Sequence, residues 1–173
     1  MTKTTHKLSR RSMLLLAGVL FIAQAASAQI WTAAASTCMP DETSFGLYQA
    51  NKGGVVLNLA PPLVSTVVLR CNVTSPAGTV APAWTRLTLG YWDPDGPLAG
   101  AVVQAQLWEV TKATSVTTPV AGALVVSALP GYGVGSAVFV HPFDFNLYVY
   151  YVEITISRIN AGGQPGALFV ALD

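Results

Sequence analysis

The segment Asn146-Leu-Tyr-Val-Tyr-Tyr-Val-Glu-Ile-Thr-Ile-Ser157 decides the fold of this chain. Its side chains fall into two alternating sets, Tyr148, Tyr150, Val152, Ile154 and Ile156 against Val149, Tyr151, Glu153, Thr155 and Ser157. A period of two residues puts the two sets on opposite faces of an extended backbone. The β-branched and aromatic side chains also favour a strand. The segment therefore predicts a long β-strand that buries one of its faces.

Three further segments repeat this pattern, Val64 to Val73, Trp84 to Trp92 and Ala101 to Val110. We expect one face of each segment to point into the core. The inward residues are Val67, Leu69, Cys71 and Val73 in the first segment, Leu87, Leu89 and Tyr91 in the second, and Val103, Ala105 and Leu107 in the third. Shorter strands are predicted at Ser44 to Ala50, Gly54 to Leu59, Ala123 to Ala128, Val134 to Val140 and Ala167 to Leu172.

Turn-forming residues separate these strands. Asn51-Lys52-Gly53-Gly54 and Asp93-Pro94-Asp95-Gly96-Pro97 supply positive φ angles, fixed φ angles and side chains that bond their own backbone. Many short strands with no helical period predict an all-β fold, a single antiparallel β-sandwich of the jelly-roll or immunoglobulin-like kind. The alternative is a closed β-barrel, which differs mainly in strand pairing.

The first 28 residues are typical of a bacterial signal peptide. A basic start (Lys3, Lys7, Arg10 and Arg11) precedes the uncharged apolar run Met13 to Ala23, and Ala26-Ser27-Ala28 offers a cleavage site. The apolar run is too short to cross about 30 Å of hydrocarbon. We therefore expect residues 1–28 to form a signal-peptide helix and 29–173 one secreted or periplasmic domain. General secretion is the favoured route, and Ser9 to Leu14 makes the twin-arginine route the alternative.

Cys38 and Cys71 are the two cysteines of the chain. In an oxidising compartment such a pair predicts one disulfide. After cleavage the chain keeps the two thiols and one histidine, His141. A metal site would need more ligands than these three side chains. A redox pair would show the closer Cys-x-x-Cys spacing.

The charge of the mature segment excludes one class of partner. Cleavage leaves five basic and eight acidic residues, a net charge of −3 with histidine neutral, and the basic residues are scattered along the chain. Phosphate binding needs clustered cations, so no nucleic-acid partner is expected. No apolar run after residue 28 is long enough for a transmembrane span.

Several short motifs occur in a fixed order along the chain, namely Cys38-Met39-Pro40, Gly53-Gly54, the strand Val68 to Val73, Tyr91-Trp92-Asp93 and Tyr150-Tyr151-Val152. In this order the chain resembles a group of small secreted bacterial β-sandwich proteins of unknown function. Asn72 stands where that group usually has proline. The resemblance implies a β-sandwich and an exported location, and it brings no catalytic or binding residues with it.

Candidate chemistry is sparse. His141 with Asp144 and Ser136 could begin a hydrolase, but the Gly-x-Ser-x-Gly nucleophile elbow is absent, so we expect His141 to be structural. Asp93-x-Asp95-Gly96 resembles the opening of a calcium loop, yet the later ligands are missing, which favours a plain turn. The sequence thus predicts no catalytic residues, no metal site and no cofactor.

Aromatic residues are the candidates for ligand binding. Trp84, Trp92 and Trp108 are the predicted binding residues, with Tyr91 and Tyr132 also considered, because outward aromatic rings on a sandwich stack on sugar rings. Trp84 and Trp108 fall opposite the inward sets of their strands. The alternative is that loops cover them in a second small core.

The leading functional hypothesis is an exported, non-enzymatic β-sandwich that binds a glycan or another envelope polymer. The first alternative is a fibre or surface-layer subunit that lends its arm Ile30 to Thr37 to a neighbour by strand addition. A hydrolase that uses His141 is the third and weakest hypothesis.

Overall fold

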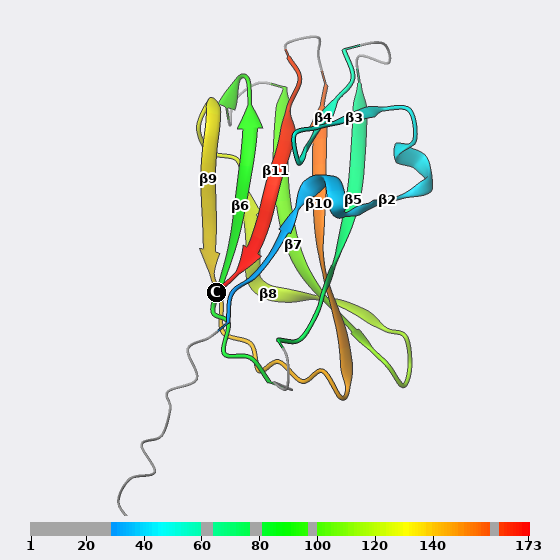
Figure 1. The fold of residues 1–173 in the computed structure, drawn as a ribbon, viewed down its shortest axis with the longest axis vertical. Coiled ribbons are helices and arrows are strands. Elements are labelled where there is room, and N and C mark those ends of the chain that lie inside the picture. The colour runs from blue at the N-terminus through cyan, green and yellow to red at the C-terminus, as the bar shows by residue number, and fades with distance from the viewer. Residues whose placement is uncertain (1–28, 60–63, 77–80, 97–99, 160–162) are drawn as a thin grey trace, which may run out of the picture.

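The computed structural model of the chain describes residues 29–59, 64–76, 81–96, 100–159 and 163–173. The predicted signal peptide, residues 1–28, lies outside the described residues. Two β-sheets face one another (Figure 1). Their strands are β1 (Trp31–Ala34), β2 (Met39–Pro40), β3 (Tyr48–Asn51), β4 (Gly54–Leu57), β5 (Ser65–Val73), β6 (Arg86–Asp93), β7 (Ala101–Thr111), β8 (Thr117–Val126), β9 (Gly131–Val138), β10 (Tyr148–Arg158) and β11 (Gly166–Leu172), with 3-10 turns η1 (Ala35–Thr37) and η2 (Glu42–Ser44).

The strand order is that of a jelly roll. Sheet A runs β3-β4-β11-β6-β9, with β1 beside β11, and sheet B runs β2-β5-β10-β7-β8. From β4 to β11 the chain changes sheet at every connection except the β7–β8 hairpin. All pairings are antiparallel. The two sheets do not close into a barrel, so the predicted sandwich is confirmed over the predicted alternative.

Alternation along the strands builds the core. The predicted inward positions of β5, β6 and β7 are buried, as are Tyr150, Val152, Ile154 and Ile156 of β10. These side chains meet Val55, Leu57, Ala167, Val170 and Leu172 of sheet A in one hydrophobic cluster. Each buried aliphatic side chain contributes about 1.5–3 kcal/mol to folding. The period-two reading of these strands is therefore confirmed.

Sheet B depends on β10, which lies between two long partners. β10 pairs with β5 over nine positions, Tyr150↔Val73 to Arg158↔Ser65, and with β7 over eleven, Tyr148↔Thr111 to Arg158↔Ala101. A shift of one residue would expose the whole buried set of β10, so burial holds this register. The same register determines which outward side chains become neighbours.

β8 is an irregular edge strand. Its register with β7 shifts between Gln106 and Trp108, Gly122 there has φ +78°, and Pro119 faces Trp108. The sequence predicted only the end of this strand, from Ala123, because proline and glycine both weaken a strand pattern. A bulge accommodates them at a sheet edge.

The disulfide forms as predicted, and it joins Cys38 to Cys71 of β5. The N-terminal arm, which the strand-addition alternative would lend to a neighbour, pairs within its own chain. Trp31–Ala34 pairs with Leu172–Phe169 of β11, and Ala35 is buried. Antiparallel hydrogen bonds and apolar packing therefore hold the arm in its own sandwich.

Removing the disulfide should destabilise the sandwich. We expect the double variant Cys38→Ala/Cys71→Ala to lose about 2–4 kcal/mol of unfolding free energy, because the unfolded chain regains its loop entropy. Urea unfolding followed by tryptophan fluorescence measures this loss. Reduction of the wild type should produce a similar shift and should leave the variant unchanged. An equal urea midpoint for oxidised and reduced wild type would contradict the expectation.

Candidate functional site

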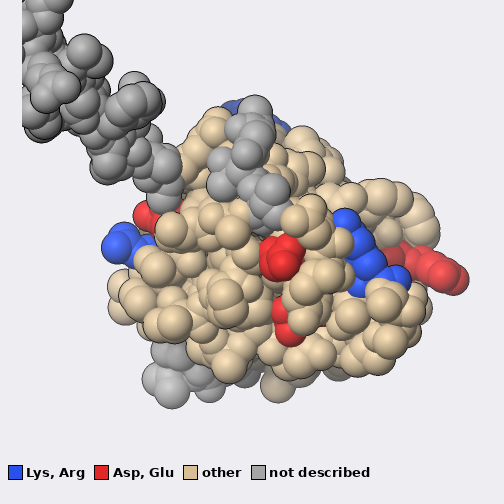
Figure 2. Space-filling model, turned by 90° about the horizontal axis from the view of Figure 1, so that it is seen from below, with Lys and Arg blue, Asp and Glu red and all other residues tan. Residues whose placement is uncertain are grey.

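Charged side chains are few on the surface. Figure 2 shows Lys, Arg, Asp and Glu in small separate groups on a largely uncharged face. This face lacks the concentrated positive charge that phosphate binding requires. The neighbouring strands of sheet B nevertheless gather polar and aromatic groups on their outer face, and this outer face of sheet B is the candidate site.

The register of β10 arranges the outer face of sheet B in rows. Tyr151 lies between Asn72 of β5 and Trp108 of β7. In the next row Glu153 lies between Arg70 and Gln106. Directly opposite side chains on one face stand about 4.5–5.5 Å apart at Cβ, so each row is a set of touching groups.

Trp108 and Tyr151 form the aromatic part of this face. Their rings are parallel within 8° and their centroids lie 6.3 Å apart. Both side chains are partly buried and keep some exposed surface. Burial raises the pKa of the Tyr151 phenol, and the charge of Glu153 raises it further. The phenol therefore stays protonated at neutral pH and keeps a hydroxyl that both donates and accepts hydrogen bonds.

The indole N–H of Trp108 has no acceptor within the described part of the chain, although its nitrogen is buried. An unpaired buried donor costs about 1–3 kcal/mol. Gln106, beside it, points its amide N–H groups at backbone, donating to the carbonyls of Leu107 at 2.8 Å and Val120 at 3.1 Å. The outer face therefore holds one unmet hydrogen bond next to its aromatic rings.

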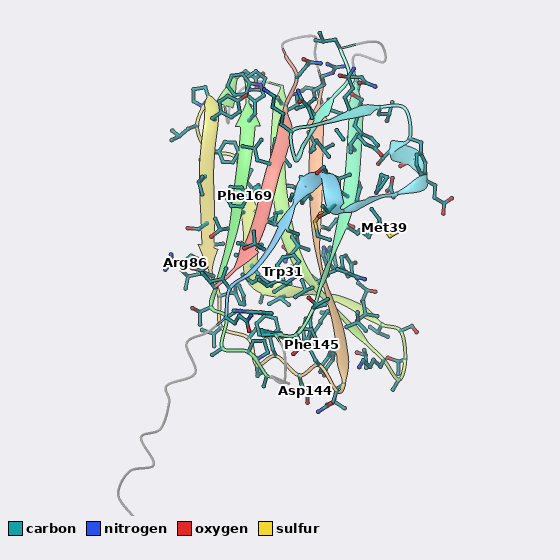
Figure 3. All side chains as sticks on the ribbon, in the orientation of Figure 1. Trp31, Met39, Arg86, Asp144, Phe145 and Phe169 are labelled. Atoms are coloured by element: carbon teal, nitrogen blue, oxygen red, sulfur yellow. A yellow bond between two sulfur atoms is a disulfide. The ribbon has the colours of Figure 1, made fainter. Side chains whose placement is uncertain are left out.

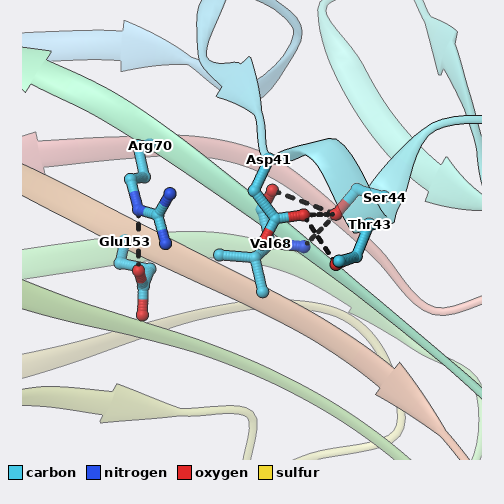
Figure 4. A network of polar contacts seen from close by, with 6 residues as sticks. All are labelled: Asp41, Thr43, Ser44, Val68, Arg70 and Glu153. Carbon is cyan, nitrogen blue, oxygen red and sulfur yellow. Dashed lines mark hydrogen bonds and ion pairs between the residues drawn. The ribbon is translucent and has the colours of Figure 1, made fainter.

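An ion pair flanks the aromatic rings. Arg70 Nε donates to Glu153 Oε2 at 3.0 Å, and the two side chains are 50% and 21% exposed (Figure 4). A pair this exposed contributes only about 0–1 kcal/mol to stability. Its consequence is positional, because it joins the side chains of the neighbouring strands β5 and β10 beside the rings.

A hollow of about 710 Å³ adjoins Arg70 and Asn72 at the β2 edge of the sheet. Segment 37–45 lines its other side, and Met39 projects there with 74% exposure (Figure 3). Phe45, 68% exposed, supplies a second apolar side chain. The hollow thus adjoins the outer face of sheet B at its β2 edge.

Asp41 anchors the wall of this hollow. Its carboxylate accepts hydrogen bonds from the Ser44 hydroxyl at 2.6 Å and the Thr43 hydroxyl at 2.9 Å (Figure 4). The Ser44 oxygen in turn accepts from Val68 N of β5 at 2.9 Å. The bond from Ser44 is the main reason that the pKa of Asp41 lies below its ordinary value. Asp41 therefore stays ionised and ties segment 41–44 to the sheet.

Trp84 lies where the sequence did not place it. It is 1% exposed, its indole N–H donates to Gln29 O at 2.6 Å, and its ring packs edge-on against Phe143. The outward placement was wrong because the N–H groups of Thr85 and Arg86 both bond Asp173 O, at 2.8 and 2.9 Å. Two residues opposite one constitute a bulge, which resets the alternation ahead of β6.

Trp92 lies on the other sheet, away from Trp108. It faces Tyr132 of β9 in register, with ring centroids 4.5 Å apart and planes tilted by 45°. Among the three predicted tryptophans, Trp108 belongs to the outer face of sheet B, Trp92 to the outer face of sheet A and Trp84 to the core. Sequence reasoning missed Tyr151, whose position beside Trp108 depends on the register between two distant strands.

His141 pairs with an acid that the sequence did not indicate. Its Nε2 lies 3.4 Å from Glu109 Oε2 and 3.4 Å from the Tyr150 hydroxyl. Asp144, the predicted partner, instead accepts the N–H groups of Asn146 and Leu147 in a turn at the lower end (Figure 3). Ser136 is exposed on β9. The described side chains therefore bring no serine to His141.

The Asp93–Gly96 segment is a turn. Asp93 is buried, Oδ1 accepts Gly96 N at 3.0 Å, and Oδ2 accepts the Ser127 hydroxyl. Burial raises the pKa of the neighbouring Asp95, and its contact with Asp93 raises it further.

Within the described ranges, no three His, Cys, Asp or Glu side chains gather as metal ligands would. No helix among the described residues has the length and hydropathy that a membrane crossing needs.

No protein-family model and no curated protein sequence matches this chain. Solved structures similar to it include a low-affinity xylan-binding module, CBM86, of Roseburia intestinalis, with TM-score 0.47, 11% identity and coverage of 84% of this chain and 93% of that one. A family two carbohydrate esterase from Cellvibrio japonicus follows with TM-score 0.41, 15% identity and coverage of 83% and 33%. An infectious bursal disease virus structure has TM-score 0.33, 15% identity and coverage of 83% and 31%. Such values concern the fold alone.

Trp84→Ala should unfold the lower end of the sandwich rather than alter a surface. We expect a loss of about 3–5 kcal/mol in unfolding free energy, measured by urea denaturation, because a fully buried indole leaves a cavity. Trp84→Phe should lose less, since a ring remains against Phe143. A loss below about 1 kcal/mol for the alanine variant would contradict the packing.

His141 should make stability depend on pH. Burial lowers its pKa, and the charge of Glu109 opposes this only in part. Because the unfolded histidine binds its proton more readily, unfolding free energy should fall as pH drops below the unfolded value of about 6.5 and level off below the folded pKa. Urea unfolding at several pH values, compared with His141→Gln, isolates this contribution. Parallel pH profiles for the two proteins would rule it out.

Proposed function

We propose that this protein is an exported, non-catalytic domain that binds a glycan or another neutral polymer of the cell envelope on the outer face of sheet B. The observation that carries the proposal is the partly exposed, parallel pair Trp108–Tyr151, set in register beside the polar side chains of Arg70, Glu153 and Gln106. The disulfide supports an oxidising, extracytoplasmic location.

The chemistry of this face suits a sugar chain. A pyranose presents C–H groups on its faces and hydroxyl groups around its rim, so it needs π-rich rings beneath and hydrogen-bonding groups beside it. Trp108 and Tyr151 provide the rings, whose faces carry partial negative charge. Arg70 supplies donors, Glu153 acceptors and Gln106 a side-chain carbonyl oxygen. The hollow beside Arg70 gives a bound chain room to continue past the β2 edge.

A binding role also agrees with the contacts that the titratable side chains make. His141 contacts Glu109 and Tyr150 beneath an aromatic cluster, and Asp93 and Asp144 bond turn backbone. These groups already serve the fold, which leaves the outer face of sheet B with groups that recognise rather than react. The strand-addition alternative loses its donor, since β1 is paired with β11.

Substitution of the aromatic pair tests the proposal. Wild type should be retained by at least one polymer in a pull-down panel of xylan, cellulose, laminarin, chitin and peptidoglycan. Trp108→Ala and Tyr151→Ala should each weaken that binding by about tenfold or more, as central aromatic contacts do. Trp108→Phe should weaken it less.

Ile159→Ala is the matched control, because Ile159 is an exposed apolar residue beyond the end of β10. It should bind as wild type does. Circular dichroism confirms that each variant is folded. Failure of wild type to bind any member of the panel, or unchanged binding by the Trp108 and Tyr151 variants, would overturn the proposal.

A further inference from the structure

We propose that Trp92 and Tyr132 form a second sugar-stacking site, on the outer face of sheet A, so that one molecule bridges two chains of an uncharged polysaccharide. The inference rests on the proposed function and extends it to the opposite sheet. Its starting point is a repeated arrangement. Each sheet carries one Trp–Tyr pair in cross-strand register on its outer face, Trp108 with Tyr151 in sheet B and Trp92 with Tyr132 in sheet A.

The structure of β9 directs Tyr132 to solvent. Its inward positions include Gly131, Gly133 and Gly135, while Tyr132 and Val134 alternate with them outward. A Cβ at Gly133 would lie 2.6 Å from the Tyr91 ring, so the core accepts no side chain there. Tyr132 is 76% exposed, which means that its ring adds little to the packing of the sandwich. Its exposed surface is therefore free to contact a ligand.

The described side chains around the pair on the outer faces of β6, β9 and β11 are mostly apolar or uncharged. The ring of Phe169 of β11 lies over Gly90, because a Cβ built on Gly90 would be 2.3 Å from that ring. Val134, which faces Gly90 across the strands, is 67% exposed. Thr88 and Ser136 form the following row. Along β6 and β9 from this pair, the first charged side chain on the outer face is Arg86, which faces Asp173 at 3.9 Å. Along the described strands of this face, a neutral sugar therefore desolvates no charge, whereas a charged polymer would meet no opposite charge beside the pair.

The two pairs are too far apart to hold one sugar chain along a single surface. Trp92 lies next to the last residue of β6, at the end where the chain turns toward Ala101 of β7. Trp108 is seven residues farther along β7, about 23 Å toward the opposite end, and the sheets themselves are about 10 Å apart. The pairs also face opposite directions, as sheet A in front and sheet B behind in Figure 1 make clear. Two separate polymer chains are therefore the natural occupants, and linkage through one domain raises avidity.

Two double variants separate this inference from the proposed function. Affinity electrophoresis through gels that contain xylan, hydroxyethyl cellulose, laminarin or glycol chitin measures retention of wild type, Trp92→Ala/Tyr132→Ala and Trp108→Ala/Tyr151→Ala. Calorimetry with the matching hexasaccharide counts sites. We expect two sites in wild type, one in each double variant and none when all four rings are removed. Turbidity of the dissolved polymer should rise with wild type alone.

Conservative and oligomer controls complete the test. Trp92→Phe/Tyr132→Phe should keep both sites, and thermal melts show whether each variant is folded. A single site in wild type that Trp92→Ala/Tyr132→Ala leaves intact would overturn the inference while the proposed function survives. A single site lost only with Trp92 and Tyr132 would overturn the sheet B site and, with it, the bridging of two chains. Light scattering measures the oligomeric state of wild type and of Trp92→Ala/Tyr132→Ala. A wild-type dimer that becomes a monomer in this variant would mean that the face binds a second copy of the chain, and it would overturn the inference. Wild type that binds no gel would overturn both.

Discussion

The register of β10 between β5 and β7 is the constraint on which this molecule depends. Tyr150, Val152, Ile154 and Ile156 are all buried at once only in that register. Once it is held, Tyr151 must lie beside Trp108, and Glu153 must lie between Arg70 and Gln106. Hydrophobic burial on one face therefore positions the polar and aromatic groups on the other. A single strand serves the core and the candidate site together.

The two outer faces differ in character although the same alternation builds both. Sheet B presents an ion pair, amide groups and a hollow beside its aromatic rings, while sheet A presents rings among valines and small residues. Cross-strand aromatic pairs contribute about 0.2–1 kcal/mol each to a sheet, so stability accounts for part of their presence. It does not account for rings left exposed where the core gains nothing from them, as at Tyr132.

Local patterns predicted most of the scaffold and only part of the candidate site. The alternation in 146–157 and the two cysteines were sufficient for β10, the sandwich and the disulfide. Trp84 was misplaced because a bulge created by the distant residue Asp173 reverses the alternation ahead of β6. The Glu109–His141 and Trp108–Tyr151 contacts join residues far apart in sequence, so they depend on strand order and register. Composition and spacing carry no information about those quantities.

The irregular edge at β8 bears on how copies of this domain coexist. Pro119 offers no N–H, and the bulge at Gly122 turns the neighbouring backbone away from a flat ladder. A strand from another copy could not form a continuous ladder of backbone hydrogen bonds along this edge. This edge of sheet B is therefore protected against the strand-by-strand stacking that leads to amyloid-like assembly.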